Sequence, residues 1–324
     1  MKLAPIGETH YKYNKIMRDT KSRPCMSTKK APMRPKKDKK MPQASNRGQN
    51  RDKRHQKFNN SATKNTTELR APKNSYFIWG HHAIAPALQN PKRRIKAIYT
   101  TVEALPKFET MIADLKQNRR TELPEPKIIE RHQLDMLPTD SGKAVHQGLA
   151  VAVQPLDSPY LEDYLEDLSE ETAHRLMILD QVSDPRNIGA ILRSARAFGT
   201  SAVILQDRHA PEETGTLART AVGALEDVTL IRVVNLTRAI EALKEYGFHI
   251  AGLDMDGSNR FATYAVQDRL ALVMGSEGKG MRRLVREACD DIIAISMADS
   301  SESLNVSVAA SIVMHATQPN EKKC

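Results

Sequence analysis

The stretch Ser301-Glu302-Ser303-Leu304-Asn305-Val306-Ser307-Val308-Ala309-Ala310-Ser311 lies close to the carboxyl end of the 324-residue chain. This stretch combines serine hydroxyl groups and the carboxamide of Asn305 with many small apolar residues. Ser303 and Asn305 directly precede Val306 to Ala316, a run that predicts a short buried helix. Their polar groups would lie at the start of that helix, where unpaired backbone N–H groups gather. The simplest interpretation of these residues is a helix cap.

Two segments upstream also join a buried strand to a polar turn. Leu179 to Gly199 reads LDQVSDPRNIGAILRSARAFG, which predicts a strand, a turn, and a helix closed by glycine. Leu270 to Met281 reads LALVMGSEGKGM, a buried strand that breaks into a glycine-rich turn carrying Glu277. The turn has neither the GxGxxG nor the GxxxxGK[ST] spacing, which argues against a Rossmann dehydrogenase or a P-loop NTPase.

Taken in order, the three segments resemble the motifs of the SpoU (TrmH) family of RNA ribose 2′-O-methyltransferases. The matching residues are Asn187 and Arg193 in the first segment, Glu277 in the second, and Ser303 and Asn305 in the third. The resemblance implies that these five residues are catalytic. It also implies that the carboxyl-terminal segment forms a deep trefoil knot, although threaded chains are rare in proteins generally.

The resemblance further implies that Gly275, Ile295 and Leu304 contact S-adenosylmethionine. Without the motifs, the three would be read as turn or core residues. Glycine lets the backbone approach a ligand closely. One departure from the family is Ser296, which stands where the family usually has proline after the position of Ile295. Methyl transfer from a sulfonium needs no metal, and no metal-ligand spacing is found in the sequence.

Arg193 matches the catalytic arginine of the family, whereas Arg186 and Arg196 on the same segment are alternatives from the residues alone. A guanidinium has a pKa above about 12 and is a poor base. We therefore expect Arg193 to bind the target phosphate and to stabilise the developing alkoxide. Glu277 could orient Arg193 or Asn187. Ser303 and Asn305 could position ribose hydroxyls, with loop or helix capping as the simpler roles.

The net charge of +10 is distributed unevenly along the chain. The first 72 residues carry +15 and the remainder −5, and the first segment has few large aliphatic residues. This composition predicts a disordered basic arm over residues 1–72. Lys outnumbers Arg 13 to 7 there and no apolar face repeats, which favours an RNA-binding arm over a transit peptide. The cysteines Cys25, Cys289 and Cys324 form no CxxC pair, which fits a reducing cytoplasm.

Residues 73–154 alternate strand and helix patterns and resemble the L30e-like RNA-binding domain of the family. The motif His146-Gln147-Gly148-Leu149 lies near the end of this domain, and we interpret His146 as a turn residue with a satisfied ring rather than a catalytic one. Residues 155–172 predict an acidic, solvated and partly helical linker. Residues 173–324 predict an α/β methyltransferase domain with a mainly parallel sheet covered on both faces. Its strands are expected at Leu176–Asp180, Ala202–Gln206, Leu230–Val233, Phe248–Leu253, Leu270–Met274 and Asp291–Ile295.

The sequence as a whole predicts a cytoplasmic, homodimeric enzyme that methylates a ribose 2′-hydroxyl of RNA, with S-adenosylmethionine as cofactor and without metal or membrane. Within the family it looks most like the bacterial enzymes that modify a guanosine of 23S ribosomal RNA. Two alternatives stay open: a ribose methyltransferase acting on tRNA or mitochondrial ribosomal RNA, and a ribosome-assembly factor that binds RNA without catalysis. Retention of Arg193, Glu277, Ser303 and Asn305 argues against the second.

Overall fold

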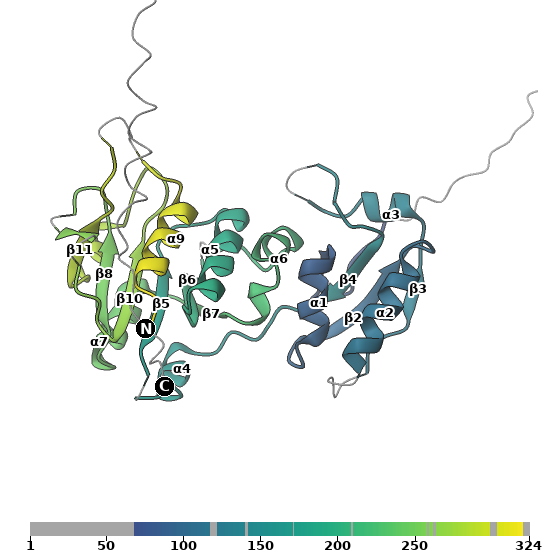
Figure 1. Ribbon diagram of the computed structural model, residues 1–324, viewed down its shortest axis with the longest axis horizontal. Coiled ribbons are helices and arrows are strands. Elements are labelled where there is room, and N and C mark those ends of the chain that lie inside the picture. The colour runs from purple at the N-terminus through teal and green to yellow at the C-terminus, as the bar shows by residue number, and fades with distance from the viewer. Residues whose placement is uncertain are drawn as a thin grey trace, which may run out of the picture. The chain divides into compact units, whose positions relative to one another are not determined.

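A computed structural model describes residues 68–116, 122–139, 142–170, 172–208, 210–257, 259–261, 264–298 and 303–319. The predicted basic arm, apart from its last five residues, lies outside this description. Figure 1 shows two β-sheets, each flanked by helices.

The smaller sheet has four strands in the order β1-β4-β2-β3. Its central strand β4 (Leu149–Val153) is buried along its whole length and runs antiparallel to β1 (Tyr76–Trp79) and β2 (Ile95–Thr100). The edge strand β3 (Pro126–Ile128) pairs parallel with β2. The helices among these strands are α1 (His81–Gln89), α2 (Leu105–Lys116) and α3 (Arg131–Asp135).

The larger sheet has seven strands in the order β7-β6-β5-β10-β8-β11-β9, and every neighbouring pair is parallel. The mainly parallel sheet expected from the sequence is therefore confirmed. The strands are β5 (His174–Leu179), β6 (Ala202–Gln206), β7 (Thr229–Val233), β8 (His249–Leu253), β9 (Asn259–Arg260), β10 (Arg269–Met274) and β11 (Asp291–Ala294).

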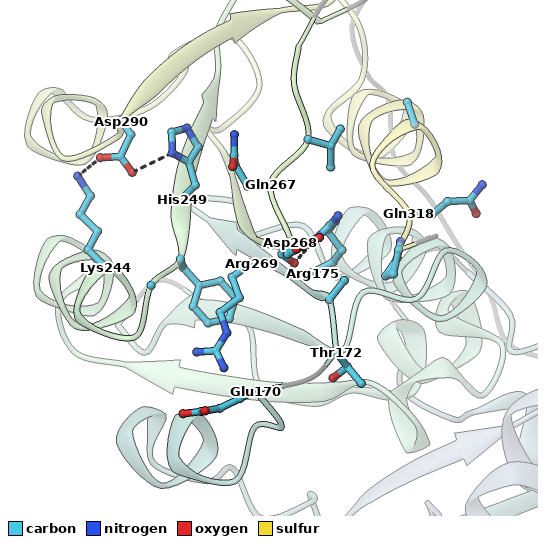
Figure 2. A pocket seen from close by; sticks show the side chains of 16 residues that line it. Glu170, Thr172, Arg175, Lys244, His249, Gln267, Asp268, Arg269, Asp290 and Gln318 are labelled. Carbon is cyan, nitrogen blue, oxygen red and sulfur yellow. Dashed lines mark hydrogen bonds and ion pairs between the residues drawn. The ribbon is translucent and has the colours of Figure 1, made fainter. Parts of the chain in front are cut away.

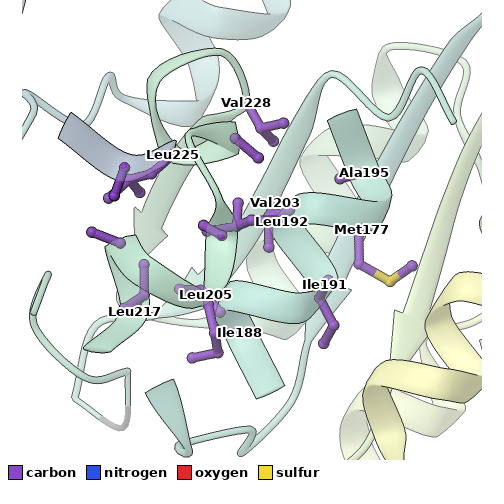
Figure 3. Packing of buried hydrophobic residues seen from close by; sticks show 14 of the residues in the cluster. Met177, Ile188, Ile191, Leu192, Ala195, Val203, Leu205, Leu217, Leu225 and Val228 are labelled. Atoms are coloured by element: carbon purple, nitrogen blue, oxygen red, sulfur yellow. The ribbon is translucent and has the colours of Figure 1, made fainter. Parts of the chain in front are cut away.

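Successive residues of β5 point to opposite faces of the larger sheet and join two different cores. Met177 and Leu179 pack with α5 (Pro185–Ala197), α6 (Gly215–Ala221) and α9 (Val306–Ala316). Figure 3 shows Ile188, Ile191 and Leu192 of α5 packed over this face. Leu176 and Ile178 pack with α4 (Leu161–Glu166), α7 (Leu236–Glu245) and α8 (Arg283–Glu287) on the other face. Burial on both sides explains the nearly continuous apolar sequence of these strands.

The acidic segment predicted to be a solvated linker is partly packed. Its helix α4 buries Leu161 and Leu165 in the second core, while Glu162, Asp163 and Glu166 of the helix are exposed. Four elements were not expected from the sequence, namely α3, β9, α6 and the 3₁₀ turn η1 (Ala224–Glu226). Gly215, the first residue of α6, is required by close packing, because a Cβ there would lie 1.9 Å from the Trp79 ring. Tertiary contact, more than a local pattern, defines this helix.

The chain order reverses between β5 and β10. From β5 the chain builds β6 and β7 outward on one side, and it then returns to build β8 to β11 on the other, with β10 inserted beside β5. After β11, helix α9 comes back to α5, where Ser194 Oγ and Ser311 Oγ lie 2.7 Å apart. In open parallel sheets, ligands bind outside the carboxyl ends of the strands at such a switch point. The carboxyl ends of β5 and β10 are therefore where a site is expected.

A buried ion cluster joins the loop before β2 to the segments around α6. Arg93, with a side chain 0% exposed, lies 2.8 Å from Glu213 and 2.7 Å from Glu226, whose side chains are 6% and 4% exposed. Tyr76 Oη donates to Glu213 and Asn90 Nδ2 donates to Glu226. Burial is the main cause that raises the pKa of Tyr76, and the negative charge of Glu213 raises it further. These residues all belong to one compact unit, Thr63–Cys324.

We expect Arg93→Met to lower the free energy of unfolding by about 3–5 kcal/mol, because two buried carboxylates would lose their cation. Arg196 provides the matched control, since it pairs with Asp227 at 2.9 Å but both side chains are about half exposed. Arg196→Met should cost less than about 1 kcal/mol. Urea unfolding followed by circular dichroism measures both. Equal midpoints for the two variants would contradict this account of the cluster.

Candidate functional site

Four neighbouring parallel strands end at the same edge of the larger sheet. β5 leads into Asp180, β10 into Gly275, β8 into Asp254 and β11 into Ile295. Because these strands are parallel and adjacent, the four residues lie side by side at their carboxyl ends. Two of the predicted cofactor-binding residues, Gly275 and Ile295, are among them.

The structure brings together one residue from each of the three motifs. Asn305 Nδ2 donates to Asn187 Oδ1 at 3.2 Å and to Glu277 Oε2 at 3.5 Å. Asn305 is also the N-cap of α9, because its Oδ1 accepts from Ser307 N at 2.9 Å and from Ser307 Oγ at 2.6 Å. The cap turns Oδ1 toward the helix, so Nδ2 faces the other two residues. The Asn305 side chain therefore has two roles: it caps α9, and it joins Asn187 to Glu277.

Local sequence explains where Asn187 lies. Asp184 is the N-cap of α5 and accepts from Arg186 N at 2.8 Å, and Pro185 occupies the first helical turn, where its missing N–H matters least. Asn187 consequently lies in the first turn of α5, close to the carboxyl edge of the sheet. Hydrogen bonding from the Arg186 side chain lowers the pKa of the Asp184 carboxyl.

The turn after β10 folds back over its own strand end. Ser276 N donates to Gly280 O at 3.1 Å and Gly280 N donates to Ser276 O at 3.0 Å. A Cβ at Gly275 would lie 2.0 Å from the Gly280 carbonyl carbon, so no other residue fits there without moving the turn. Glu277 lies exposed within this closed turn. The glycines of the motif are thus required by the turn itself.

The three arginines of α5 differ in their partners. Arg186 pairs with Asp184 at 3.1 Å and Arg196 pairs with Asp227 at 2.9 Å. Arg193 is exposed, and among the described residues no carboxylate lies within ion-pair distance of it. Its guanidinium is therefore the one of the three whose charge is not already matched by a described side chain. Within the described part of the chain it makes no hydrogen bond or ion pair with Asn187, Glu277 or Asn305.

The remaining predicted residues border the same edge. Ile295 is half-buried and packs against the first core, and Leu304 is half-buried immediately before the α9 cap. Ser303 is exposed, and within the described ranges its hydroxyl has no hydrogen-bond partner. Half-buried apolar side chains beside backbone of a glycine turn suit a flat, partly apolar ligand with polar edges. The donors and surfaces present thus fit an adenosyl group.

Two residues of this edge carried no expectation from the sequence. Asp180 is fully buried and is bound by Arg282, whose Nε and Nη2 lie 2.8 and 2.7 Å from Oδ1. At the end of β8, with β10 between them, Asp254 pairs with Arg286 at 2.7 Å. The sequence does contain a signal for both residues, because each is an aspartate at the end of an apolar strand, directly before a polar turn.

His146 is part of the fold of the smaller sheet rather than of this edge. Its ring is 2% exposed in relative area, its Nδ1 accepts from Gly148 N at 3.0 Å, and its Nε2 lies 3.1 Å from Asp135 Oδ1. The interpretation as a turn residue with a satisfied ring is confirmed. The hydrogen bond from His146 lowers the pKa of Asp135.

Cys289 is the one cysteine that the structure describes, and it is no candidate nucleophile. Burial raises the pKa of its thiol to about 12, so the thiol stays protonated at neutral pH. Its Sγ donates to Val285 O within α8.

A large cavity lies at the opposite edge of the sheet, at the amino ends of β5, β8 and β10. Its volume is about 1160 Å³, and none of the predicted site residues lines it. Figure 2 shows that some of its charged side chains already have partners: Lys244 lies 2.5 Å from Asp290, and Arg175 donates to the backbone carbonyl of Asp268. The volume of a cavity therefore does not identify the functional site. The polar groups that converge at the carboxyl edge of the sheet identify it instead.

Within the described ranges, no three His, Cys, Asp or Glu side chains gather closely enough to hold a metal ion. In the same part of the chain no helix is long and apolar enough to cross a bilayer.

Comparison with known proteins gives a family match for the residues of each of the two sheets. Residues 174–315 match the SpoU rRNA Methylase family, and residues 77–159 match a family described as RNA 2′-O ribose methyltransferase substrate binding. A TrmH family tRNA/rRNA methyltransferase of Staphylococcus haemolyticus is 35% identical over 239 residues, which cover 74% of this chain and 93% of the relative. The chain belongs to the SpoU (TrmH) family of tRNA/rRNA methyltransferases.

Other relatives match over a shorter length. An uncharacterised tRNA/rRNA methyltransferase of Mycobacterium avium is 40% identical over 186 residues, which are 57% of this chain and 59% of the relative. The chain thus spans about three fifths of the length of this mycobacterial relative.

Solved structures share the fold. The SpoU methyltransferase AviRb from Streptomyces viridochromogenes, in complex with the cofactor AdoMet, has a TM-score of 0.61 and 19% identity over 75% of this chain and 89% of its own. An AdoMet-bound rRNA methyltransferase from Sinorhizobium meliloti has a TM-score of 0.58 and 18% identity over 75% of this chain and 87% of its own.

Proposed function

We propose that the protein transfers a methyl group from S-adenosylmethionine to a ribose 2′-hydroxyl of RNA. The observation that carries the proposal is the meeting of Asn187, Glu277 and Asn305, which come from three separate segments, beside the Gly275 turn. Membership of the SpoU family and a match to an RNA substrate-binding family support the same reaction. The AdoMet complexes of two proteins with this fold support the cofactor.

The cofactor would be held by the backbone of the Gly275 turn and by Ile295 and Leu304. S-adenosylmethionine, when bound, supplies a methyl group that its sulfonium already activates, so the protein chiefly has to orient the hydroxyl and manage its proton. The Ile295 and Leu304 side chains would exclude water from one side of the adenosyl group. Ser296, in place of the usual proline, leaves the Ile295 backbone contact available.

Arg193 would act on the nucleophile. Its guanidinium stays charged at neutral pH, so it would bind the phosphate next to the target ribose and stabilise the alkoxide as the hydroxyl proton leaves to phosphate or water. Asn187 keeps its amide N–H₂ available after accepting from Asn305, and that group could donate to a ribose oxygen. Ser303, which is exposed, and Asn305 would position the hydroxyls of the same ribose, and Glu277 would orient Arg193 or Asn187.

We further propose a guanosine of 23S ribosomal RNA as the target, on the resemblance of the motifs. A tRNA or a mitochondrial ribosomal RNA is the alternative substrate, and RNA binding without catalysis is the alternative function. Mapping ribose methylation in ribosomal RNA and tRNA from cells that lack the protein separates these cases, because one missing methyl group identifies the substrate. An unchanged methylation map would favour the non-catalytic function.

The domain organisation follows from the same proposal. Residues 73–154 would be an L30e-like RNA-binding domain, residues 155–172 the connection, and residues 173–324 the methyltransferase domain of a cytoplasmic protein. The packing of α9, which follows β11 in the chain, against α5 is compatible with a knotted chain. An experimental structure that traces residues 295–306 tests the knot.

The first prediction concerns Arg193. Arg193→Ala should lower the rate of methyl transfer by about a hundred- to a thousandfold, because it removes the charge that stabilises the alkoxide. Affinity for S-adenosylmethionine, measured by calorimetry with a chelator present, should stay close to that of the wild type. Arg196→Ala is the control, since that arginine is paired with Asp227. Near-normal single-turnover rates in Arg193→Ala would rule out the assignment.

The second prediction concerns a homodimer. Val308 and Ile312 lie one turn apart on α9 and are 48% and 38% exposed, which leaves apolar surface on the helix that carries Asn305. We propose that a second copy of the chain covers it. Ile312→Glu should convert a dimer to a monomer in sedimentation. A wild-type protein that sediments as a monomer at all concentrations would eliminate the dimer.

The third prediction concerns the arm of residues 1–72, which carries +15 against −5 for the remainder. Each phosphate neutralised on a single strand contributes about −0.7 to the slope of log affinity against log salt. Deleting the arm should therefore flatten this slope by several units and leave methyl transfer intact. If the arm is a removable targeting segment, the truncated and full-length proteins will show the same RNA affinity and salt slope.

A further inference from the structure

Asp180 is a charged residue buried at the centre of the candidate site. Its exposed fraction is 0%, and it directly follows β5 at the carboxyl edge of the sheet. A carboxylate removed from water in this way is stable only when cations and N–H donors satisfy both of its oxygens. Among the described residues, every hydrogen-bond donor to the Asp180 carboxylate belongs to Arg282.

The contacts with Arg282 use both carboxylate oxygens. Oδ1 accepts from Nε at 2.8 Å and lies 2.7 Å from Nη2, a two-pronged pairing that suits the planar guanidinium. Oδ2 accepts from the backbone N–H of Arg282 at 2.7 Å. The carboxylate therefore fixes the backbone of Arg282 as well as its side chain.

Asp180 also holds the other end of the glycine turn. Its backbone N–H donates to Met274 O at 2.8 Å, and Met274 is the residue immediately before Gly275. Arg282 is the residue immediately after Met281, where the turn ends and where α8 has its N-cap. One residue thus binds the chain on both sides of the turn Gly275–Met281.

The same residue begins the segment that carries Asn187. From Asp180 the chain passes through Gln181, which has a φ of 60°, to the Asp184 cap and the first turn of α5. Glu277 in the turn and Asn187 on α5 are the two acceptors of Asn305 Nδ2. A shift of the turn relative to β5 would therefore separate Glu277 from Asn187.

We infer that Asp180 is the positioning residue of this site: it fixes the Gly275–Met281 turn to the end of β5 and so aligns Glu277 with Asn187 and the backbone that contacts the cofactor. This inference rests on the proposed function for its link to cofactor binding, and on the contacts alone for the position of the turn. Asp180 is not a catalytic residue, because it is buried behind the turn.

Asp290 offers a matched control. Its Oδ2 accepts from Ile250 N at 2.8 Å and its Oδ1 lies 2.5 Å from Lys244 Nζ, so it too binds one backbone N–H and one cation. It lies before β11, at the opposite edge of the same sheet, and lines the large cavity rather than the candidate site. Replacing it by Asn likewise removes a carboxylate that binds a backbone N–H and a cation, at a side chain that is 32% exposed and does not contact the turn.

The experiment compares Asp180→Asn, Asp290→Asn and the wild-type protein. Hydrogen exchange of the peptide covering Ser276 to Arg282 should accelerate in Asp180→Asn and stay unchanged in Asp290→Asn. Calorimetry with S-adenosylhomocysteine should show affinity weakened roughly tenfold in Asp180→Asn, equivalent to 1.4 kcal/mol, and unchanged in Asp290→Asn. Neither measurement requires turnover.

A double variant guards against misfolding. Asp180→Asn combined with Arg282→Met removes both charges, so no unpaired charge stays buried and the fold should be retained. It should show the same faster exchange and weaker binding. Wild-type exchange of the turn in folded Asp180→Asn or in the double variant would overturn the positioning role. If the wild-type protein binds no S-adenosylhomocysteine, the proposed function fails, while the exchange data still decide whether Asp180 fixes the turn.

Discussion

The parallel pairing of β10 with β5 is the constraint on which the rest of the structure depends. Six consecutive residue pairs, from Arg269 with His174 to Met274 with Leu179, join segments that are far apart in sequence. Because the strands are parallel and in this register, the polar turns that follow them start at the same level. The Glu277 turn and the α5 segment with Asn187 can therefore meet. A shift by one residue would turn Met274 and Leu179 to the wrong faces of the sheet.

Strong patterns in the sequence predicted the strands well. β6 has the expected bounds and β10 ends at the expected Met274, because buried apolar runs bordered by polar turns leave few alternatives. α6 was missed because its short sequence GTLARTA has little apolar periodicity, and its position depends on contacts such as that of Gly215 with Trp79. The burial of Arg93 was not predicted either. Nothing in the local sequence shows that two glutamates more than a hundred residues away surround it.

The site was predictable as a set of residues but only partly as a geometry. The motifs named Asn187, Glu277 and Asn305, and the structure joins them through the Asn305 amide. The direction of that amide depends on the α9 cap, which the sequence did suggest. The roles of Arg193, Ser303, Ile295 and Leu304 remain proposals, because their partners would be ligands rather than other parts of the chain. The sequence did not predict a role for Asp180, because that role depends on its ion pair with Arg282. The fold brings these two residues together.

The cap of α9 has a consequence for the synthesis of the protein. Asn305 completes the polar cluster, but its amide is oriented only when Val306–Ala316 is helical and packed against α5. Chains fold as they emerge from the ribosome, amino-terminal parts first. The β5 to β7 half can therefore form while the later strands are still being made, but it contains no assembled cluster. The nascent polypeptide thus stays without a complete polar centre until its last described helix has been translated and docked.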